Sequence, residues 1–307
     1  MKISVIGAGN VGSLTAMRLA EEGLGEILLV DIVKGLAQGK TFDMEDARVI
    51  LKNNYSVKGS NYIEDISGSD IVILTAGLPR KPGMTREDLL NKNALIVRNI
   101  SLDIKRLADK AIFIVVTNPV DLMSRLALET TAFERRRVFG MGLNLDAARF
   151  ANVISKALNI ATSDIEPCVI GSHGEGMLPL ARFTKVRGVP LDEVAGDKIL
   201  AEMVNKTTER GHEIVTLLAS GSAYFAPSAA ITEIVKTIAK DEKCIIGVSA
   251  YLDGEYGVKD TYVGVPCRLG KNGIEDIVEL ALEPQEKDSF LKVAVQLGAQ
   301  YKNIAIP

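Results

Sequence analysis

Short apolar runs of strand length alternate with longer stretches in which apolar residues recur at helical spacing. In the first half of the chain, these runs predict strands at residues 2–6, 26–30, 70–75, 112–116 and 137–139. Helical spacing follows the first run, and a long helix is expected at residues 87–108. Strands that alternate with helices favour an α/β fold with a doubly wound parallel sheet, in which ligands bind at the carboxyl ends of the strands.

The second half has a mixed pattern of helices and strands. A helix is expected to begin near Asn144, and its apolar stripe is expected to be buried: Phe150, Val153, Ile154, Ala157 and Leu158. The other elements expected here are strands at 245–251 and 262–269, a hairpin turn at 271–273, and a terminal helix at 284–301 for core and subunit contacts. We therefore expect two domains, residues 1–142 and residues 143–307, the second of the α+β type.

Three glycines follow the first predicted strand in the pattern GxGxxG. Gly7, Gly9 and Gly12 lead into a helical stretch, and Asp31 ends the second predicted strand. One glycine permits the tight turn, the next lets the backbone approach a pyrophosphate, and the third lets the helix pack close to the strand. A carboxylate at Asp31 can accept both ribose hydroxyls and would repel a 2′-phosphate, which favours NAD over NADP. This order predicts a dinucleotide site; the alternative is a glycine turn that is only structural.

Composition narrows the classes of partner. The net charge of −3 argues against nucleic acid or an anionic membrane surface as the main partner. The three cysteines are widely separated and form no CxxC pair, so we expect neither a disulfide framework nor a bound metal. No apolar stretch approaches the ~20 residues of a membrane span, and we expect a cytoplasmic protein.

The segment GSHGEGMLP at residues 171–179 contains His173, one of two histidines in the chain. Oxidation of an alcohol by NAD requires a group that accepts the hydroxyl proton, and histidine suits this role because its ordinary pKa of ~6.5 is close to neutral pH. Asp146 is the candidate carboxylate that would orient the ring, while His212, in a charged helical stretch, is the weaker candidate base. The alternative is a histidine packed in a glycine-rich turn without a catalytic role.

Arginines occur in two settings that suit an anion. The loop GLPRKPGMTRED contains Arg80, Lys81 and Arg86 and follows a central strand, where the nicotinamide end of a cofactor would lie. Closure of this loop would bring its arginines over an anion. A solvated surface loop is the alternative reading of these charges. Arg149 lies three residues after Asp146 on the predicted helix, and a local ion pair would also explain this spacing.

Together these motifs resemble those of the lactate/malate dehydrogenase superfamily, and the similarity extends over nearly the whole chain. In chain order they are GAGNVG, Asp31, PRKPGMTR, TNPVD, LDAAR and GSHGEG. The long lid motif is most similar to that of the lactate-dehydrogenase-like malate dehydrogenases. The resemblance implies a Rossmann domain for NAD, an α+β domain for substrate and catalysis, reversible oxidation of (S)-malate to oxaloacetate, and assembly into homodimers or homotetramers.

The resemblance also implies a role for each polar residue of the motifs. His173 is the proton acceptor and Asp146 orients it, while Arg149 binds the C1 carboxylate of the substrate with two hydrogen bonds. Arg86 polarises the reacting carbonyl, and Asn118, in a cis Asn–Pro bond, hydrogen-bonds near the same oxygen and helps to hold the nicotinamide. The residues implied to contact the cofactor are Gly7, Gly9, Asn10, Val11, Gly12, Asp31, Thr75, Ala76, Gly77, Asn93, Val116 and Asn118.

Substrate choice is implied to depend on Arg80. Its lid position is typically arginine in malate dehydrogenases, where it faces a second carboxylate, and glutamine in lactate dehydrogenases. Ala223 and Ala226 in GSAYFAPSAA would leave room for that carboxylate. A dicarboxylate is therefore the expected partner. The alternatives are a lactate or other 2-hydroxyacid dehydrogenase and, in a different class, a non-catalytic NAD-binding protein.

Overall fold

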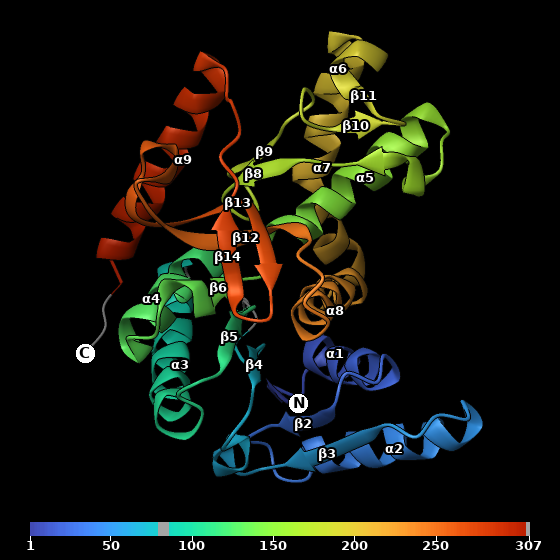
Figure 1. Ribbon diagram of the computed structural model, residues 1–307, viewed down its shortest axis with the longest axis vertical. Coiled ribbons are helices and arrows are strands. Elements are labelled where there is room, and N and C mark those ends of the chain that lie inside the picture. The colour runs from blue at the N-terminus through green and yellow to red at the C-terminus, as the bar shows by residue number, and fades with distance from the viewer. Residues whose placement is uncertain (79–85, 305–307) are drawn as a thin grey trace.

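The computed structural model describes residues 1–78 and 86–304, with Arg86 described by its backbone alone. Its first half contains the strands β1 (Lys2–Ile6), β2 (Glu26–Val30), β3 (Ser56–Ser60), β4 (Ile71–Leu74), β5 (Ile112–Val115) and β6 (Val138–Gly140). The helices of this half are α1 (Asn10–Glu21), α2 (Leu36–Ile50), α3 (Arg86–Leu107), α4 (Val120–Thr131) and the 3-10 helices η1 (Ile63–Ile66) and η2 (Arg135–Arg137). Strands and helices alternate, as the apolar pattern predicts (Figure 1).

The second half mixes helices with antiparallel strands. Its helices are α5 (Leu143–Leu158), η3 (Thr162–Asp164), α6 (Leu191–Val194), α7 (Asp197–Leu218), α8 (Phe225–Ala239), η4 (Glu255–Gly257) and α9 (Pro284–Lys302). Its short strands are β7 (Ile165–Glu166), β8 (Val169–Gly171), β9 (Met177–Pro179), β10 (Lys185–Val186) and β11 (Val189–Pro190). The longer strands are β12 (Ile245–Asp253), β13 (Lys259–Gly270) and β14 (Gly273–Ile277).

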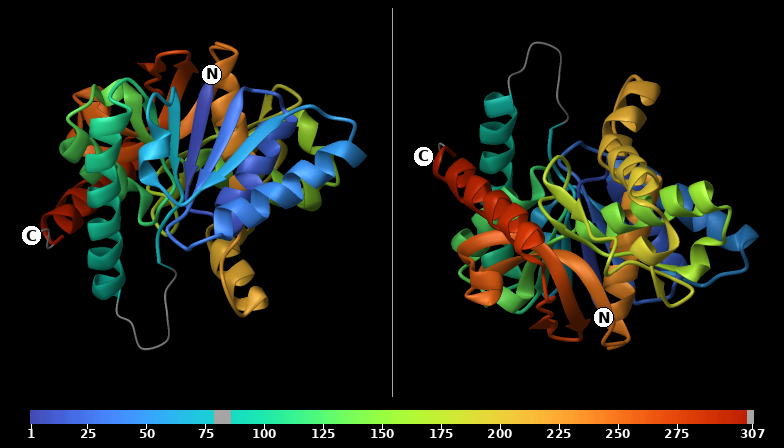
Figure 2. Two further views of the ribbon diagram at one scale, coloured as in Figure 1. Left: turned by 90° about the horizontal axis from the view of Figure 1, so that it is seen from below. Right: turned by 90° about the horizontal axis from the view of Figure 1, so that it is seen from above.

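The six strands among the described residues of the first half are parallel and lie in the order β3-β2-β1-β4-β5-β6, which is that of a doubly wound sheet. The direction of winding reverses between β1 and β4, so the crevice for a ligand lies at the carboxyl ends of these two strands. Helices α3 and α4 pack against each other on one side of the parallel strands, while α1 packs against α8 on the other side (Figure 2). The predicted fold class is confirmed.

The sheet continues from the first half into the second. Strand β6 joins β12 through the antiparallel pair of Gly140 and Ser249, and the order then runs β12-β13-β8-β9, with β14 also paired to β13. The main hydrophobic core likewise spans both halves and includes Phe113 and Phe290, while a second cluster forms around α5 and includes Phe150. One continuous frame therefore positions the glycine loop after β1 and the histidine turn after β8.

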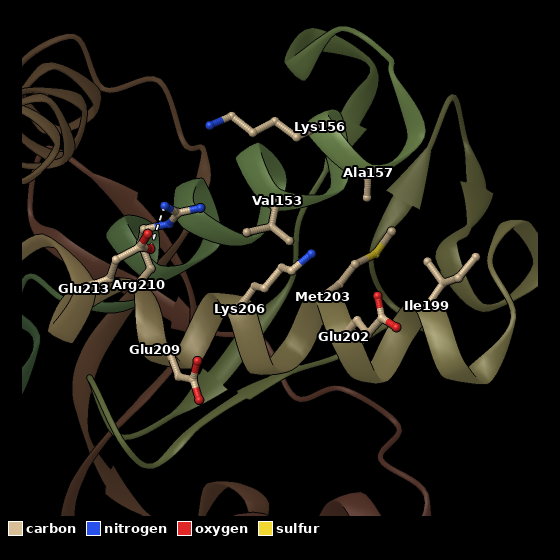
Figure 3. A pocket seen from close by; sticks show the side chains of 10 residues that line it. All are labelled: Val153, Lys156, Ala157, Ile199, Glu202, Met203, Lys206, Glu209, Arg210 and Glu213. Carbon is tan, nitrogen blue, oxygen red and sulfur yellow. Dashed lines mark hydrogen bonds and ion pairs between the residues drawn. The ribbon is translucent and has the colours of Figure 1, made fainter.

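Three observations correct or complete the expected elements. Neither α2 nor β3 is predicted by the apolar pattern. Helix α2 turns large side chains such as Phe42 and Ile50 to solvent, and β3 contains one large apolar residue, Val57. Ala157 is exposed rather than buried, because it faces a groove between α5 and α7 (Figure 3). The hairpin turn is confirmed, with two residues between the paired Gly270 and Gly273. Within the described residues, no helix combines the length and the apolar character needed to cross a membrane.

Candidate active site

The three glycines of the loop between β1 and α1 have different surroundings. Gly7 has a φ of +107°, and a Cβ there would lie 2.7 Å from the nitrogen of Ala76. A Cβ at Gly12 would lie 1.8 Å from the carbonyl oxygen of Gly7, so only glycine lets α1 pack against the turn. At Gly9, the N-cap of α1, a Cβ would meet no atom of the described residues within 4 Å. The first N–H groups of a helix lack partners within it, and beside this open backbone they suit a phosphate group.

Asp31 lies at the carboxyl end of β2 and is tied to the glycine loop. Its Oδ2 accepts the backbone N–H of Ala8 at 2.7 Å, and its Oδ1 accepts that of Val33 at 2.9 Å. From α2, Lys40 donates to the carbonyl oxygen of Ala8 at 2.6 Å and to the hydroxyl of Ser13 at 3.0 Å. No sequence motif indicates Lys40, because its partner is a backbone oxygen on another element. It places a positive charge beside the loop that would hold phosphates.

The residues expected around the nicotinamide meet at the carboxyl ends of β4 and β5. Asn93 donates from its amide to the carbonyl oxygen of Asn118 at 2.9 Å, and its side-chain oxygen accepts the N–H of Leu78 at 2.8 Å. Asn118 itself is exposed, and the cis Asn118–Pro119 bond that the resemblance implies is present. The other residues expected here follow the same two strands: Thr75, Ala76, Gly77 and Val116. Asn93 therefore joins the two strand ends and leaves the Asn118 side chain accessible.

Asp146 connects His173 with Arg149. Its Oδ2 lies 2.7 Å from Nδ1 of His173, and its Oδ1 accepts a hydrogen bond from Arg149 at 3.1 Å. The Asp146 side chain is fully buried, whereas 15% of His173 and 13% of Arg149 remain exposed. A carboxylate at Nδ1 favours the tautomer with hydrogen on that atom, which leaves the Nε2 lone pair free to accept a proton. The structure thus brings the three predicted side chains together, and the local ion pair of Asp146 and Arg149 is present as well.

Small residues set how closely the elements around His173 approach one another. Gly171, directly before its turn, has a φ of +96°, a conformation that side chains disfavour. A Cβ at Gly142, the N-cap of α5, would lie 3.0 Å from the Cβ of His173. On α7, a Cβ at Gly211 would lie 3.5 Å from the guanidinium of Arg149. The glycines of this region therefore have a packing role next to the catalytic candidates.

The pKa of His173 is raised above its ordinary value. Burial alone would lower this pKa, but the charge of Asp146 and the hydrogen bond to it outweigh burial; Arg149 opposes the rise, and Asp121 adds to it. The imidazolium form is therefore stabilised, which suits a group that gains a proton during alcohol oxidation and returns it during carbonyl reduction. The other histidine, His212, is exposed on α7.

A cavity of about 880 Å³ lies beside His173, between its turn and the helices α3, α4 and α9. Val293 and Leu297 of α9 border this cavity as well as contributing to the core, and sequence reasoning assigns them only to core and subunit contacts. A separate groove of about 490 Å³ between α5 and α7 has a charged rim, in which Arg210 pairs with Glu213 (Figure 3). No histidine lines that groove among the described residues, so we assign the reaction to the surroundings of His173, Asp146 and Arg149.

The lid motif PRKPGMTR contains the two arginines expected to contact the substrate, Arg80 and Arg86. Arg80 and the side chain of Arg86 lie outside the described residues, so their roles stay predictions. The two small residues expected to leave room for a second carboxylate lie before and at the start of α8, where Ala223 is half-buried and Ala226 is exposed.

Comparisons with known proteins identify the family of this chain. The family model described as lactate/malate dehydrogenase, NAD binding domain, matches residues 1–140, and that of the lactate/malate dehydrogenase alpha/beta C-terminal domain matches residues 144–305. The malate dehydrogenase of Methanosarcina acetivorans is 48% identical over 95% of this chain and 95% of its own length.

Two solved structures show the same architecture. The malate dehydrogenase of Cryptosporidium parvum has a TM-score of 0.95 and 37% identity, covering 99% of this chain and 98% of that one. The lactate dehydrogenase of Eimeria maxima, solved with NADH and oxamate, has a TM-score of 0.95 and 34% identity, covering 99% of this chain and 93% of that one. With both family models matched over almost the full length, this chain belongs to the lactate/malate dehydrogenase family.

Proposed function

We propose that this chain is an NAD-dependent malate dehydrogenase, which reversibly converts (S)-malate and NAD⁺ into oxaloacetate and NADH. The observation that carries the proposal is the Asp146 carboxylate held between His173 and Arg149, which joins a proton acceptor to a cation suited to a carboxylate. Relatives named malate dehydrogenase, up to 48% identical over nearly the full length, support a dicarboxylate substrate. The fold itself does not separate the substrates, because a lactate dehydrogenase shares it with a TM-score of 0.95.

The residues of the crevice fit NAD. The open backbone at Gly9 and the first turn of α1, which begins with Asn10 and Val11, would hold the pyrophosphate. Asp31 would accept the hydroxyls of the adenosine ribose, and Asn118 would hold the nicotinamide end. When bound, NAD⁺ supplies the acceptor for the hydride that leaves the alcohol carbon.

In malate oxidation, Nε2 of His173 takes the proton of the substrate hydroxyl. The electron pair of the O–H bond forms the second bond of the carbonyl group, while the C–H bond breaks and its electron pair leaves with the hydrogen. Asp146 accepts the Nδ1–H of His173, which fixes the ring and stabilises the imidazolium. Arg149 binds the C1 carboxylate with the N–H donors that Asp146 does not occupy. In the reverse direction, His173 returns the proton to the carbonyl oxygen, which Arg86 would polarise.

Arg80→Gln is expected to lower kcat/KM for oxaloacetate by at least about tenfold, because the second carboxylate loses its counter-ion, and to change pyruvate reduction far less. Steady-state oxidation of NADH with each substrate, in the wild type and the variant, measures both effects. Lys81→Gln removes a neighbouring positive charge and is the matched control. Equal losses on both substrates would contradict the role of Arg80 in substrate choice. A preference of the wild type for pyruvate would mean that the chain is a lactate dehydrogenase instead.

A non-catalytic NAD-binding protein is the alternative of a different class. The geometry around His173 weighs against it, because binding a dinucleotide does not require a histidine oriented at Nδ1 by a buried carboxylate. Turnover of NADH with any 2-oxoacid excludes this alternative.

We also infer that the chain assembles into homodimers or homotetramers. Support comes from α2 and its C-cap, where four large apolar side chains are more than half exposed: Phe42, Val49, Ile50 and Leu51. Sedimentation equilibrium of the wild type is expected to give a multiple of the 33.0 kDa chain mass, and Ile50→Asp to lower it. Val189→Asp, at an exposed position on β11, is the control that should leave the mass unchanged. A wild-type mass of one chain would contradict the inference.

Two further features complete the proposal. We place the boundary between the cofactor domain and the catalytic domain at residues 142–143, which the limits of the two family models at residues 140 and 144 support. We also expect a cytoplasmic location, which the three unpaired cysteines support because thiols persist in a reducing compartment.

A further inference from the structure

A second buried carboxylate, Asp121, contacts the turn that carries His173. It lies in the first turn of α4, and only 3% of it is exposed. Its Oδ1 accepts the hydroxyl of Ser249 at 2.6 Å. Its Oδ2 accepts the hydroxyl of Ser172 at 3.0 Å and the backbone N–H of His173 at 3.2 Å. Asp121 ends the motif TNPVD, but nothing in the sequence pattern assigns it a role.

Three hydrogen bonds satisfy the buried carboxylate of Asp121. Burying a carboxylate costs free energy unless it is hydrogen-bonded or paired with a charge. Burial raises the pKa of Asp121, and the hydrogen bond from Ser249, the charge of His173 and the bonds from Ser172 and the His173 backbone oppose that rise. The charge of His173 is therefore among the groups that favour its ionised form. The first turn of a helix also favours a negative charge.

Charged groups of several elements act on His173 or line the cavity beside it. They are Asp146 and Arg149 of α5, Asp121 of α4, Glu175 of its own turn and Glu87 of α3, which lines the same cavity. Asp146 contacts the ring at Nδ1, whereas Asp121 contacts the backbone of the same residue. The two buried carboxylates therefore hold His173 at two different points.

We propose that Asp121 is a positioning residue of the active site with two effects on His173. Its hydrogen bonds to Ser172 and to the His173 backbone fix the turn, so that Nε2 meets the substrate hydroxyl. Its negative charge stabilises the imidazolium that forms when Nε2 takes the substrate proton. The role rests on the proposed function and adds a residue to the same site.

The charge effect is tested with Asp121→Asn, which keeps the shape and an acceptor oxygen but removes the charge. The chain has two histidines, so a His212→Asn background leaves a single imidazole, whose pKa can be followed by NMR with labelled histidine. We expect the pKa of His173 to fall by about 0.5–1 unit in Asp121→Asn. An unchanged pKa overturns this part of the proposal. The titration needs no turnover, so its outcome is independent of whether malate is the substrate.

The positioning effect is tested with two serine variants that keep the charge. Ser172→Ala and Ser249→Ala each remove one hydroxyl donor to Asp121, but only Ser172 belongs to the turn. We expect kcat for oxaloacetate reduction to fall by about tenfold in Ser172→Ala with little change in KM, and to fall clearly less in Ser249→Ala. Equal losses in the two variants, or a change in KM alone, overturn the proposal. This pair also decides it if Asp121→Asn does not fold.

Discussion

His173→Asn is expected to lower kcat for oxaloacetate reduction by about 10³-fold or more, while NADH still binds. Asparagine has a compact polar side chain that can still hydrogen-bond to Asp146, but it cannot carry a transferable proton near neutral pH. The glycine loop and Asp31, which would hold the cofactor, are not contacted by the substitution. Steady-state kinetics measure turnover, and titration of NADH fluorescence measures cofactor binding.

The control for this variant is His212→Asn. His212 is exposed on α7, and its replacement is expected to leave turnover at the wild-type rate. If the loss of turnover followed His212→Asn instead, the assignment of the base would be wrong. If His173→Asn lost NADH binding together with turnover, the histidine turn would have a structural role in the cofactor site that its geometry does not indicate.

The parallel strands are predictable from the sequence because the sheet is covered on both faces. All four residues of β4 and of β5 are buried, so each strand forms an unbroken apolar run. The helix α2 lacks a comparable signal, because Phe42 and Ile50 face solvent rather than the core. A helix whose apolar residues are directed outward does not show the one-sided pattern that identifies a surface helix.

Some residues of the candidate site can be predicted from the sequence, and others cannot. His173, Asp146 and Arg149 are predictable because their own side chains supply the chemistry and occur in recognisable motifs. Lys40 and Asp121 act on backbone groups, the Ala8 carbonyl and the His173 N–H. Almost every residue has the same backbone groups, so the sequence does not show which of them a distant side chain will contact. Such a contact becomes evident only in the folded chain.

Asp146→Asn is expected to lower kcat on the order of 10³-fold in both directions. The carboxylate accepts the Nδ1–H of His173 at 2.7 Å, whereas an amide NH₂ at the same place would donate to Nδ1. The ring hydrogen would then lie on Nε2, the atom that must accept the substrate proton. The lost charge also releases Arg149, now held at 3.1 Å, so KM for oxaloacetate is expected to change too. Steady-state kinetics with malate and with oxaloacetate measure these effects.

The same substitution is expected to shift the pH dependence of both reactions to lower pH. In the wild type the pKa of His173 is raised, so reduction, which needs the imidazolium, persists above pH ~6.5 and falls as pH rises through the raised pKa. Oxidation needs the neutral ring and increases over the same interval. In Asp146→Asn, burial still lowers the pKa of His173, while the charge of Asp146 that opposes this effect is gone. Reduction is therefore lost at lower pH than in the wild type, and oxidation also begins at lower pH. Rate profiles of the variant in both directions test this. A reduction limb that stays at the wild-type pH would mean that Asp146 acts through geometry alone.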